Sequence, residues 1–430
     1  MTDARRLPTI TDADWLRAPA TQQVFAALNQ NGHVARVVGG CVRNSLFAQL
    51  TDAANAQPAV TDIDFATTAT PAETLDFAAA ANLRTVETGL QHGTVTVISH
   101  GEGFEVTTLR RDVMTDGRHA EVAFTDDWAL DAARRDLTMN ALYADADGTI
   151  FDPLDGYDDL RQRRIRFVGD AATRIREDYL RILRFFRFFA QYGSGSPDAI
   201  GLAACVRERG GIKRLSSERI HQELMKLLGA PGVVPTLQLM AEHGLLTEIL
   251  PVVPQVARLT RLIDSDRQTD KALRLAALTV TVAEEAGRLT RSLRLSRQEA
   301  AVLQLAARVQ ETADTTAPLL DEAARQLLYR LGDENYVRWV KFRQALVPSA
   351  LPTAEWQRLA RLPADWNPPV FPVNGKVLIE LGVTPGAAMG QLLSQLEFDW
   401  LKSDFSLSRE TLLSKARAFI ASNADLPKTD

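Results

Sequence analysis

Two aspartates one residue apart, Asp62 and Asp64, are the residues in this chain best suited to chemistry. They lie at the start of a predicted strand, where side chains at i and i+2 share a face, so both carboxylates would converge. Such hard oxygen donors suit Mg²⁺ held jointly with substrate phosphates. Glu105, on a later strand, would add a third carboxylate, and three on neighbouring strands would hold two metals roughly 4 Å apart. A DxD sequence alone also occurs on ordinary exposed turns.

A second candidate site precedes the aspartates at Gly39-Gly40. A short β-branched run ends there and a helix is expected to follow, so backbone N–H groups could approach a phosphate closely. Arg43 would lie on the first helical turn and add a forked, positively charged donor. A lone Gly-Gly pair is often only a tight turn, but a phosphate cradle followed by a carboxylate pair is more specific.

One acid and three arginines recur at every third position of residues 177–188, an otherwise apolar segment that we predict to be one helix. Asp178 and Arg181 would then be neighbours on its surface and present an acceptor and a forked donor together. Such a pair could read the hydrogen-bonding edge of a base, while Arg184 and Arg187 could meet phosphate. The alternative is an amphipathic core helix with a charged edge.

Charge is unevenly distributed along the chain. The net charge of −5 gives no overall attraction to nucleic acid, yet residues 161–187 hold nine arginines and three acids, a local balance of +6. A basic stripe on an acidic protein points to local phosphate binding, although a solvated helix face would look the same. The length of 430 residues and the 46% hydrophobic content suit a globular protein of several domains.

Strand signals are confined to the first part of the chain. One hairpin is expected over residues 94–108 around a Gly-rich turn, and another over residues 142–151 around Asp147-Gly148. Residues 45–60 are polar and alanine-rich, so we expect a loop insertion, and residues 110–131 form a polar stretch. Further strands are expected at residues 34–38 and 63–67.

Beyond about residue 168 helical periodicity replaces strand alternation. The expected fold is therefore α+β, with a small sheet-containing domain followed by an all-α region. Prolines clustered over residues 348–372 indicate a hinge before the last helices. Helices are expected at residues 218–228, 271–287 and 297–312.

Cys41 and Cys205 are the only cysteines, which excludes a disulfide framework and a CxxC metal site and suits the cytoplasm. The first residues carry acids among their arginines and no apolar segment, so we expect neither a signal nor a transit peptide. No apolar run is long enough to span a membrane.

Four motifs occur along the chain in an order typical of one enzyme family: Gly39-Gly40, Asp62-x-Asp64, RRDLTMNA at residues 134–141, and Glu177-Asp178-x-x-Arg181-x-x-Arg184. In this the chain resembles the class II tRNA nucleotidyltransferases, the CCA-adding enzymes of the polymerase β superfamily. The likeness is close over about residues 34–230 and looser near residues 375–400.

The resemblance implies a mixed or antiparallel nucleotidyltransferase palm followed by helical regions. It also implies that Asp62 and Asp64 bind Mg²⁺ and that Glu105 joins them as a catalytic carboxylate. The residues implied to bind the incoming nucleotide are Gly39, Gly40, Arg43, Arg135, Asp178, Arg181, Arg184 and Arg187. The implied domains are the head at 1–165, the neck at 166–255, the body at 256–345 and the tail at 346–430.

The chain departs from the family pattern at two places. Asn44 stands where the family usually has Asp after the arginine, and residues 45–60 lengthen the gap to Asp62. Asn44 keeps the hydrogen-bonding shape of Asp but loses its charge. In the family, the region of residues 110–131 resembles a flexible loop associated with A addition.

The implied function is template-independent addition or repair of the CCA end of tRNA from CTP and ATP, with release of pyrophosphate. Cytosine and adenine each present an exocyclic amine beside a ring-nitrogen acceptor, which suits Asp178 as acceptor and Arg181 as donor. The helical region would grip the tRNA acceptor end and elbow by shape and phosphate contact. A bacterial poly(A) polymerase, an A-adding enzyme and an inert tRNA-binding protein remain alternatives.

Overall fold

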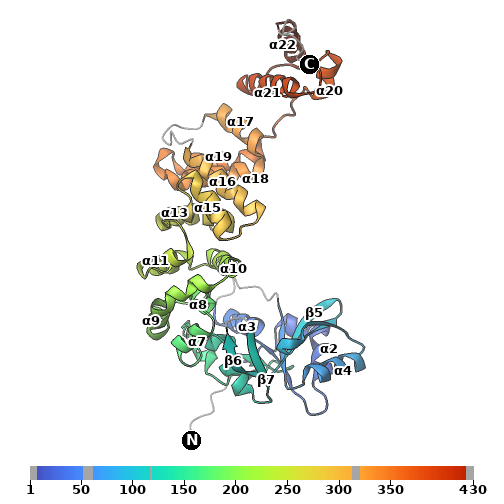
Figure 1. Cartoon of the computed structure of the whole chain (residues 1–430), viewed down its shortest axis with the longest axis vertical. Helices are drawn as coiled ribbons and strands as arrows, with labels where there is room; N and C mark the ends of the chain where they lie inside the picture. The colour runs from blue at the N-terminus through green and yellow to red at the C-terminus, as the bar shows by residue number, and fades with distance from the viewer. Residues whose placement is uncertain (1–6, 52–61, 117–118, 312–319, 423–430) are drawn as a thin grey trace. The chain divides into compact units, whose positions relative to one another are not determined.

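The computed structural model describes residues 7–51, 62–116, 119–311 and 320–422. All strands of this described part lie in the first of two compact units, and the second is helical (Figure 1), which confirms the α+β class. The predicted division into four domains stays a prediction. The first unit is Met1–Pro254 with Arg291–Arg294, and the second is Gln255–Thr290 with Leu295–Asp430.

A seven-stranded mixed sheet forms the centre of the first unit. In spatial order its strands are β3 (Arg84–Gly89), β4 (Thr94–Ser99), β5 (Glu102–Thr108), β2 (Asp64–Thr67), β1 (Ala35–Val38), β8 (Tyr143–Ala144) and β9 (Ile150–Phe151). Strands β2 and β5 are parallel, and every other neighbouring pair is antiparallel. Both predicted hairpins are confirmed, as β4–β5 and β8–β9.

Alternation along β2 decides which of its side chains reach the core. Helix α2 (Pro19–Leu28) packs on one face of the sheet. Phe65 points to that face, where its ring centroid lies 4.8 Å from that of Phe25. Asp64 and Ala66 therefore point to the opposite face, where Ala66 joins a separate buried cluster. The carboxylate of Asp64 is thus directed away from the main hydrophobic core.

The polar stretch at residues 110–131 is more regular than its composition indicates. Strands β6 (Arg110–Asp116) and β7 (His119–Phe124) form a separate two-stranded sheet, and helix α5 (Trp128–Ala133) follows. Among the described residues these two strands pair only with each other, as an antiparallel hairpin. Its turn, Gly117-Arg118, lies outside the described residues.

The expected loop insertion at residues 45–60 is partly wrong. Helix α3 (Gly40–Leu50) continues through its first residues, because Leu46 and Phe47 are buried and anchor the helix in the core. The remainder, residues 52–61, lies outside the described part of the chain.

The prediction of one helix over residues 177–188 is wrong. Helix α7 (Ala171–Glu177) ends before Asp178, whose backbone is extended, and α8 (Leu180–Tyr192) starts two residues later. The carboxylate of Asp178 accepts a hydrogen bond from the N–H of Leu180 at 3.1 Å. Such a local bond competes with the helical backbone pattern and favours a new helix start. Asp178 therefore lies in a bend between two helices.

Helix α10 (Ser217–Leu228) confirms the helix predicted over residues 218–228, and it packs against α8. Its apolar positions recur with helical spacing and face the core. The remaining helices of the first unit are α1 (Asp14–Arg17), α4 (Pro71–Ala80), α6 (Gly156–Arg161), α9 (Ala199–Glu208), α11 (Val233–Glu242) and α12 (Leu246–Ile249), with the short 3-10 helices η1 (Leu90–His92), η2 (Thr138–Asn140) and η3 (Arg209–Arg214).

The second half of the chain is helical, as expected, but one local prediction is wrong. Residues 271–287 hold two helices, α14 (Lys271–Thr279) and α15 (Ala283–Ser292), instead of one. The Pro-rich segment holds α19 (Thr353–Asp365), which accommodates Pro363 near its end, and no helix covers residues 366–374 before α20 (Gly375–Glu380); the hinge expected there stays a prediction. The others are α13 (Val256–Ser265), α16 (Arg297–Glu311), α17 (Asp321–Leu331), α18 (Asp333–Leu346), η4 (Pro348–Ala350), α21 (Ala387–Lys402) and α22 (Arg409–Ser422).

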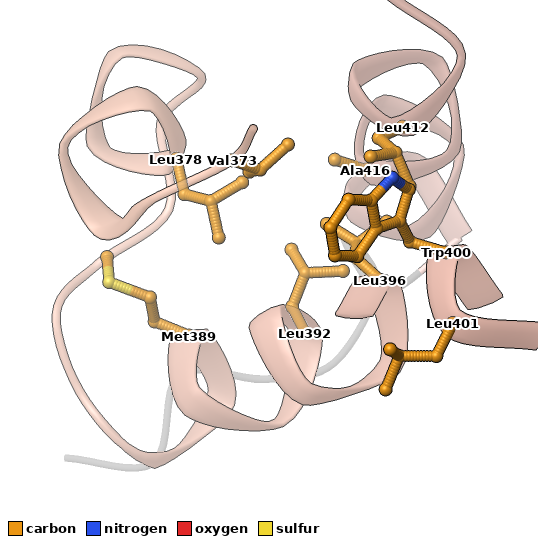
Figure 2. Close-up of a cluster of buried hydrophobic side chains, with 9 residues drawn as sticks. All are labelled: Val373, Leu378, Met389, Leu392, Leu396, Trp400, Leu401, Leu412 and Ala416. Carbon is orange, nitrogen blue, oxygen red and sulfur yellow. The ribbon is translucent and has the colours of Figure 1, made fainter. Parts of the chain in front are cut away.

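The last helices have a hydrophobic cluster of their own, shown in Figure 2. Leu392, Leu396 and Trp400 from one side of α21 meet Leu412 of α22. The Trp400 ring also lies 5.6 Å from the ring of Tyr329 on α17. These contacts give the last helices a buried cluster that does not involve the sheet. Across the described ranges, no helix is long and apolar enough to cross a membrane.

Helix α6 holds the η2 turn in place. A Cβ at Gly156 would lie 2.2 Å from the carbonyl oxygen of Thr138, so the two segments approach more closely than any side chain allows. Buried Asp159 accepts a hydrogen bond from Thr138 Oγ1 at 2.5 Å and from Arg166 Nε at 2.7 Å. These contacts from α6 therefore fix the position of the turn that carries Asn140.

We expect Gly156→Ala to destabilise the first unit by about 1–3 kcal/mol, because the methyl group must displace backbone. Gly210→Ala is the matched control, since nothing lies within 4 Å of a Cβ at that position. Thermal unfolding monitored by circular dichroism checks both variants. Equal unfolding temperatures for the two would contradict the close approach.

Candidate active site

The three predicted carboxylates lie near one another on or beside two central strands of the sheet, β2 and β5. Asp64 on β2 is the register partner of Glu105 on the parallel strand β5, and Asp62 lies two residues before it. Burial, then Glu105, raises the pKa of Asp64, with a smaller contribution from Asp62, whereas Arg135 opposes the shift. Part of the Asp64 side chain stays open to solvent. The sheet therefore concentrates negative charge there.

This charge fits a divalent cation. The described residues contain no preassembled group of three or more His, Cys, Asp or Glu side chains at metal-binding distances. Mg²⁺, however, is commonly held by only one or two carboxylates and completes its shell with water and substrate phosphates. Asp62 and Asp64 would be those ligands. Mutual repulsion of neighbouring carboxylates is the electrostatic state that a divalent cation relieves.

The Gly-Gly turn lies beside these carboxylates, because β1 pairs with β2 and places Val38 opposite Asp64. Gly39 has φ +76°, a conformation that other residues rarely adopt, and α3 begins directly after it. Cβ atoms built on Gly39 and Gly40 would lie 3.9 Å from Arg135 Nη1 and Arg43 Nη2, respectively. Two guanidinium groups thus flank a helix N-terminus, a combination suited to a phosphate group.

Arg135 is oriented by a buried acid that the sequence did not single out. Asp131 accepts hydrogen bonds from Arg135 Nη2 at 3.1 Å, Arg134 Nε at 2.7 Å and Tyr143 OH at 2.8 Å. Burial would raise the pKa of Asp131, but the two arginines and the tyrosine outweigh it and lower the pKa. A charged donor fixed in this way can hold a phosphate with little loss of side-chain entropy.

Asp178 and Arg181 each have another partner in this structure. Asp178 Oδ2 accepts from Arg219 Nη2 at 2.6 Å, and Arg181 Nη1 donates to Glu177 Oε2 at 2.5 Å. Within the described residues no side-chain hydrogen bond joins Asp178 to Arg181, although the backbone N–H of Arg181 donates to the carbonyl oxygen of Asp178 at 3.0 Å. Arg174 also donates to Glu177, at 2.6 Å. The bend between α7 and α8 therefore presents the two residues through separate ion pairs.

Arg184 and Arg187 are engaged with carboxylates too. Arg184 Nε donates to Asp136 Oδ2 at 2.6 Å, and Arg187 Nε donates to Glu223 Oε2 at 2.5 Å. Their charges are thus already compensated, and their proposed contact with the nucleotide stays untested. Glu223 is the one acid on the buried face of α10, and that position was the available sequence signal.

The basic stripe at residues 161–187 is largely paired as well. Each of its arginines except Arg163 lies within 4 Å of a carboxylate oxygen, and most of these acids lie outside the stripe. Arg163 stacks over the ring of Phe47 and donates to the carbonyl of Tyr192. The excess of arginines counted in the sequence, a local balance of +6, therefore does not produce an uncompensated basic surface.

A mixed sheet with paired carboxylates beside a Gly-Gly turn defines the head of a polymerase β-type nucleotidyltransferase. Residues 35–166 match the family described as the poly A polymerase head domain, and residues 202–256 match the probable RNA and SrmB-binding site of polymerase A. Nucleotidyltransferases of this type generally use divalent metal ions. The chain is an enzyme of this class.

Whole-chain relatives narrow the family. The mitochondrial CCA tRNA nucleotidyltransferase 1 of Mus musculus is 35% identical over 401 residues, 91% of this chain and 88% of the relative. The CCA-adding enzyme of Latilactobacillus sakei subsp. sakei (strain 23K) is 31% identical, over 93% and 96% of the two chains. The crystal structure of the Bacillus stearothermophilus CCA-adding enzyme in complex with CTP matches with a TM-score of 0.71 at 27% identity, over 94% and 98%. The chain belongs to the CCA-adding enzyme family.

Asp136 supports a pH prediction. Burial would raise its pKa, but attraction to Arg184 and hydrogen bonds from Asn140, Arg184 and the N–H of Leu137 hold the pKa far below the usual 3.8. A carboxylate whose pKa is lowered by folding stabilises the fold above its unfolded pKa, and this contribution is lost as the pH falls toward the folded pKa.

We therefore expect Asp136→Asn to lower the free energy of unfolding of the first unit at neutral pH by roughly 2–3 kcal/mol, the range for hydrogen bonds to charged groups. The gap to wild type should shrink below about pH 4, where the unfolded carboxyl is protonated. Urea titrations at several pH values measure this difference in unfolding free energy between the variant and the wild type. A constant gap would contradict the assignment, and exposed Asp126→Asn is the control.

Proposed function

We propose that this protein adds or repairs the 3′-terminal CCA of tRNA, using CTP and ATP without a nucleic-acid template and releasing pyrophosphate. The observation that carries the proposal is the alignment of Asp62 and Asp64, the Gly39-Gly40 turn and two flanking arginines within a chain that matches CCA-adding enzymes along most of its length. The Mus musculus relative is a tRNA nucleotidyltransferase by name, and the Bacillus stearothermophilus structure holds CTP.

Each residue of the site has a distinct proposed role. The N–H groups after Gly39 bind the triphosphate together with Arg43 and Arg135, which places the α-phosphorus for in-line attack. The 3′-oxygen of tRNA forms the new bond to this phosphorus while the bond to the pyrophosphate oxygen breaks. Mg²⁺ held by Asp62 and Asp64 would supply charge neutralisation at the phosphates and acidify the attacking hydroxyl. Glu105, the register partner of Asp64, would act as the third catalytic carboxylate beside them.

Base selection is assigned to Asp178 and Arg181. Asp178 would accept from the exocyclic amine of C or A, and Arg181 would donate to the adjacent ring nitrogen. Uracil and guanine would leave buried polar groups unpaired, at about 1–3 kcal/mol each. Arg219 and Glu177 hold these two side chains in the present structure. The base would therefore share or replace those ion pairs, and the helical region would hold tRNA.

A cytoplasmic location is also proposed. Both cysteines, Cys41 and Cys205, are buried and unpaired, as suits a reducing compartment. The vertebrate relatives carry the word mitochondrial in their names, so a mitochondrial location is the alternative.

Asp62→Asn and Asp64→Asn should each lower nucleotide incorporation roughly 10³-fold or more, because the charge stabilisation of the transition state is lost. Binding of tRNA, measured by gel shift, should stay within a factor of two or so. Binding of Mn²⁺ followed by electron paramagnetic resonance should weaken in both variants. Exposed Asp76→Asn is the control. Unchanged incorporation in the two variants would refute the metal assignment.

Poly(A) polymerase is the second candidate, favoured by the family models that match residues 35–166 and 202–256. Incubation with tRNA lacking its last three nucleotides, or ending in CC, with labelled CTP, ATP and Mg²⁺ separates the two. We expect products that stop at CCA. Long A tails would indicate poly(A) polymerase, and extension of only the CC-ending tRNA would indicate an A-adding enzyme.

A further inference from the structure

Arg43 differs from the other arginines of the site in the kind of partner it has. It is buried, yet its guanidinium donates only to amide oxygens: Nη1 to Asn140 Oδ1, and Nη2 and Nε to Asn44 Oδ1 at 3.0 and 3.2 Å. Arg135, Arg184 and Arg187, by contrast, each donate to a carboxylate. Within the described residues Arg43 makes no ion pair.

Aromatic rings complete this neutral environment. The guanidinium carbon of Arg43 lies 4.9 Å from the ring centroid of Phe188 and 4.7 Å from that of Tyr192, both on α8. Rings attract a cation without cancelling its charge. Tyr192 OH donates to Asn44 Oδ1 at 2.8 Å, so one amide oxygen accepts from both side chains. Asn44 thereby links the Gly-Gly turn to the helix that starts beside Asp178.

We propose that Asn44 is a positioning residue that leaves Arg43 without a directly bound carboxylate, so that the triphosphate of the incoming nucleotide becomes its contacting counter-ion. This inference rests on the function proposed above. A buried cation without an anion is costly, and a bound phosphate relieves that cost. The neutral groups around Arg43 therefore lower the stability of the free protein and raise its affinity for the triphosphate, which CTP and ATP have in common.

A carboxylate at position 44 would accept the same hydrogen bonds from Arg43 and Tyr192. It would also pair with the guanidinium and compete with the nucleotide for it. Asn44→Asp is therefore a nearly isosteric change that tests charge separately from shape. The proposal predicts opposite effects on stability and affinity, whereas a purely structural role for Asn44 predicts that both decline together.

We expect Asn44→Asp to raise the KM of both CTP and ATP roughly tenfold, equivalent to about 1.4 kcal/mol of binding. kcat should stay within about twofold and the choice between C and A should not change, because the base-reading residues are untouched. The unfolding temperature should equal or exceed that of wild type. Direct binding of ATP by equilibrium dialysis should weaken in parallel. Gln49→Glu, exposed on the last turn of α3, controls for net charge and should leave the KM values unchanged.

The outcomes separate the two proposals. A wild-type protein that incorporates neither nucleotide overturns the proposed function. If the wild type is active and the Asn44→Asp variant has the same KM values for CTP and ATP as the wild type, only the proposed role of Asn44 is overturned. A variant that fails to fold, or that loses stability along with affinity, also overturns it, because the added carboxylate should pair with Arg43. A KM change confined to one nucleotide contradicts a triphosphate contact.

Discussion

The carboxylate of Asp136 is the contact on which the arrangement of the site depends most. It accepts from Arg184 Nε on α8 at 2.6 Å, and from Asn140 Nδ2 and the N–H of Leu137 at 2.8 Å each. Asn140 in turn accepts from Arg43. One buried acid therefore joins the helix proposed to read the base to the turn proposed to bind the triphosphate.

Charge pairing sorts the arginines of the first unit into two groups. Most are held by acids such as Asp159 and Glu223, which receive two or more positive partners each and so orient structure. Arg43 instead donates to the neutral side chains of Asn140 and Asn44. The distinction matters because only an uncompensated charge contributes fully to binding an anion, whereas a paired one must first break its ion pair.

Local pattern was sufficient for β1, β2, the two predicted hairpins and the order of the candidate residues, but it did not predict β3, β6 or β7. Both hairpins were predicted because strand alternation and turn residues act within a few positions. The pairing of Asp64 with Glu105 was expected only as neighbouring strands, and its parallel register comes from the sheet. The continuous helix over residues 177–188 was a wrong prediction, because spacing cannot report that the backbone is extended at Asp178, whose carboxylate accepts from the N–H of Leu180.

The sequence by itself determined the class of fold, the positions of the Gly-Gly turn and the aspartates, and the likeness to CCA-adding enzymes. Only the tertiary structure decided which arginines are free to act. Residues 161–187 carry a local charge of +6, but eight of the nine arginines have acidic partners: five pair with acids close by in the chain, and Arg176, Arg184 and Arg187 pair with acids far along it. Ion pairs are short-range contacts between segments far apart in the chain, and composition along the chain does not contain them.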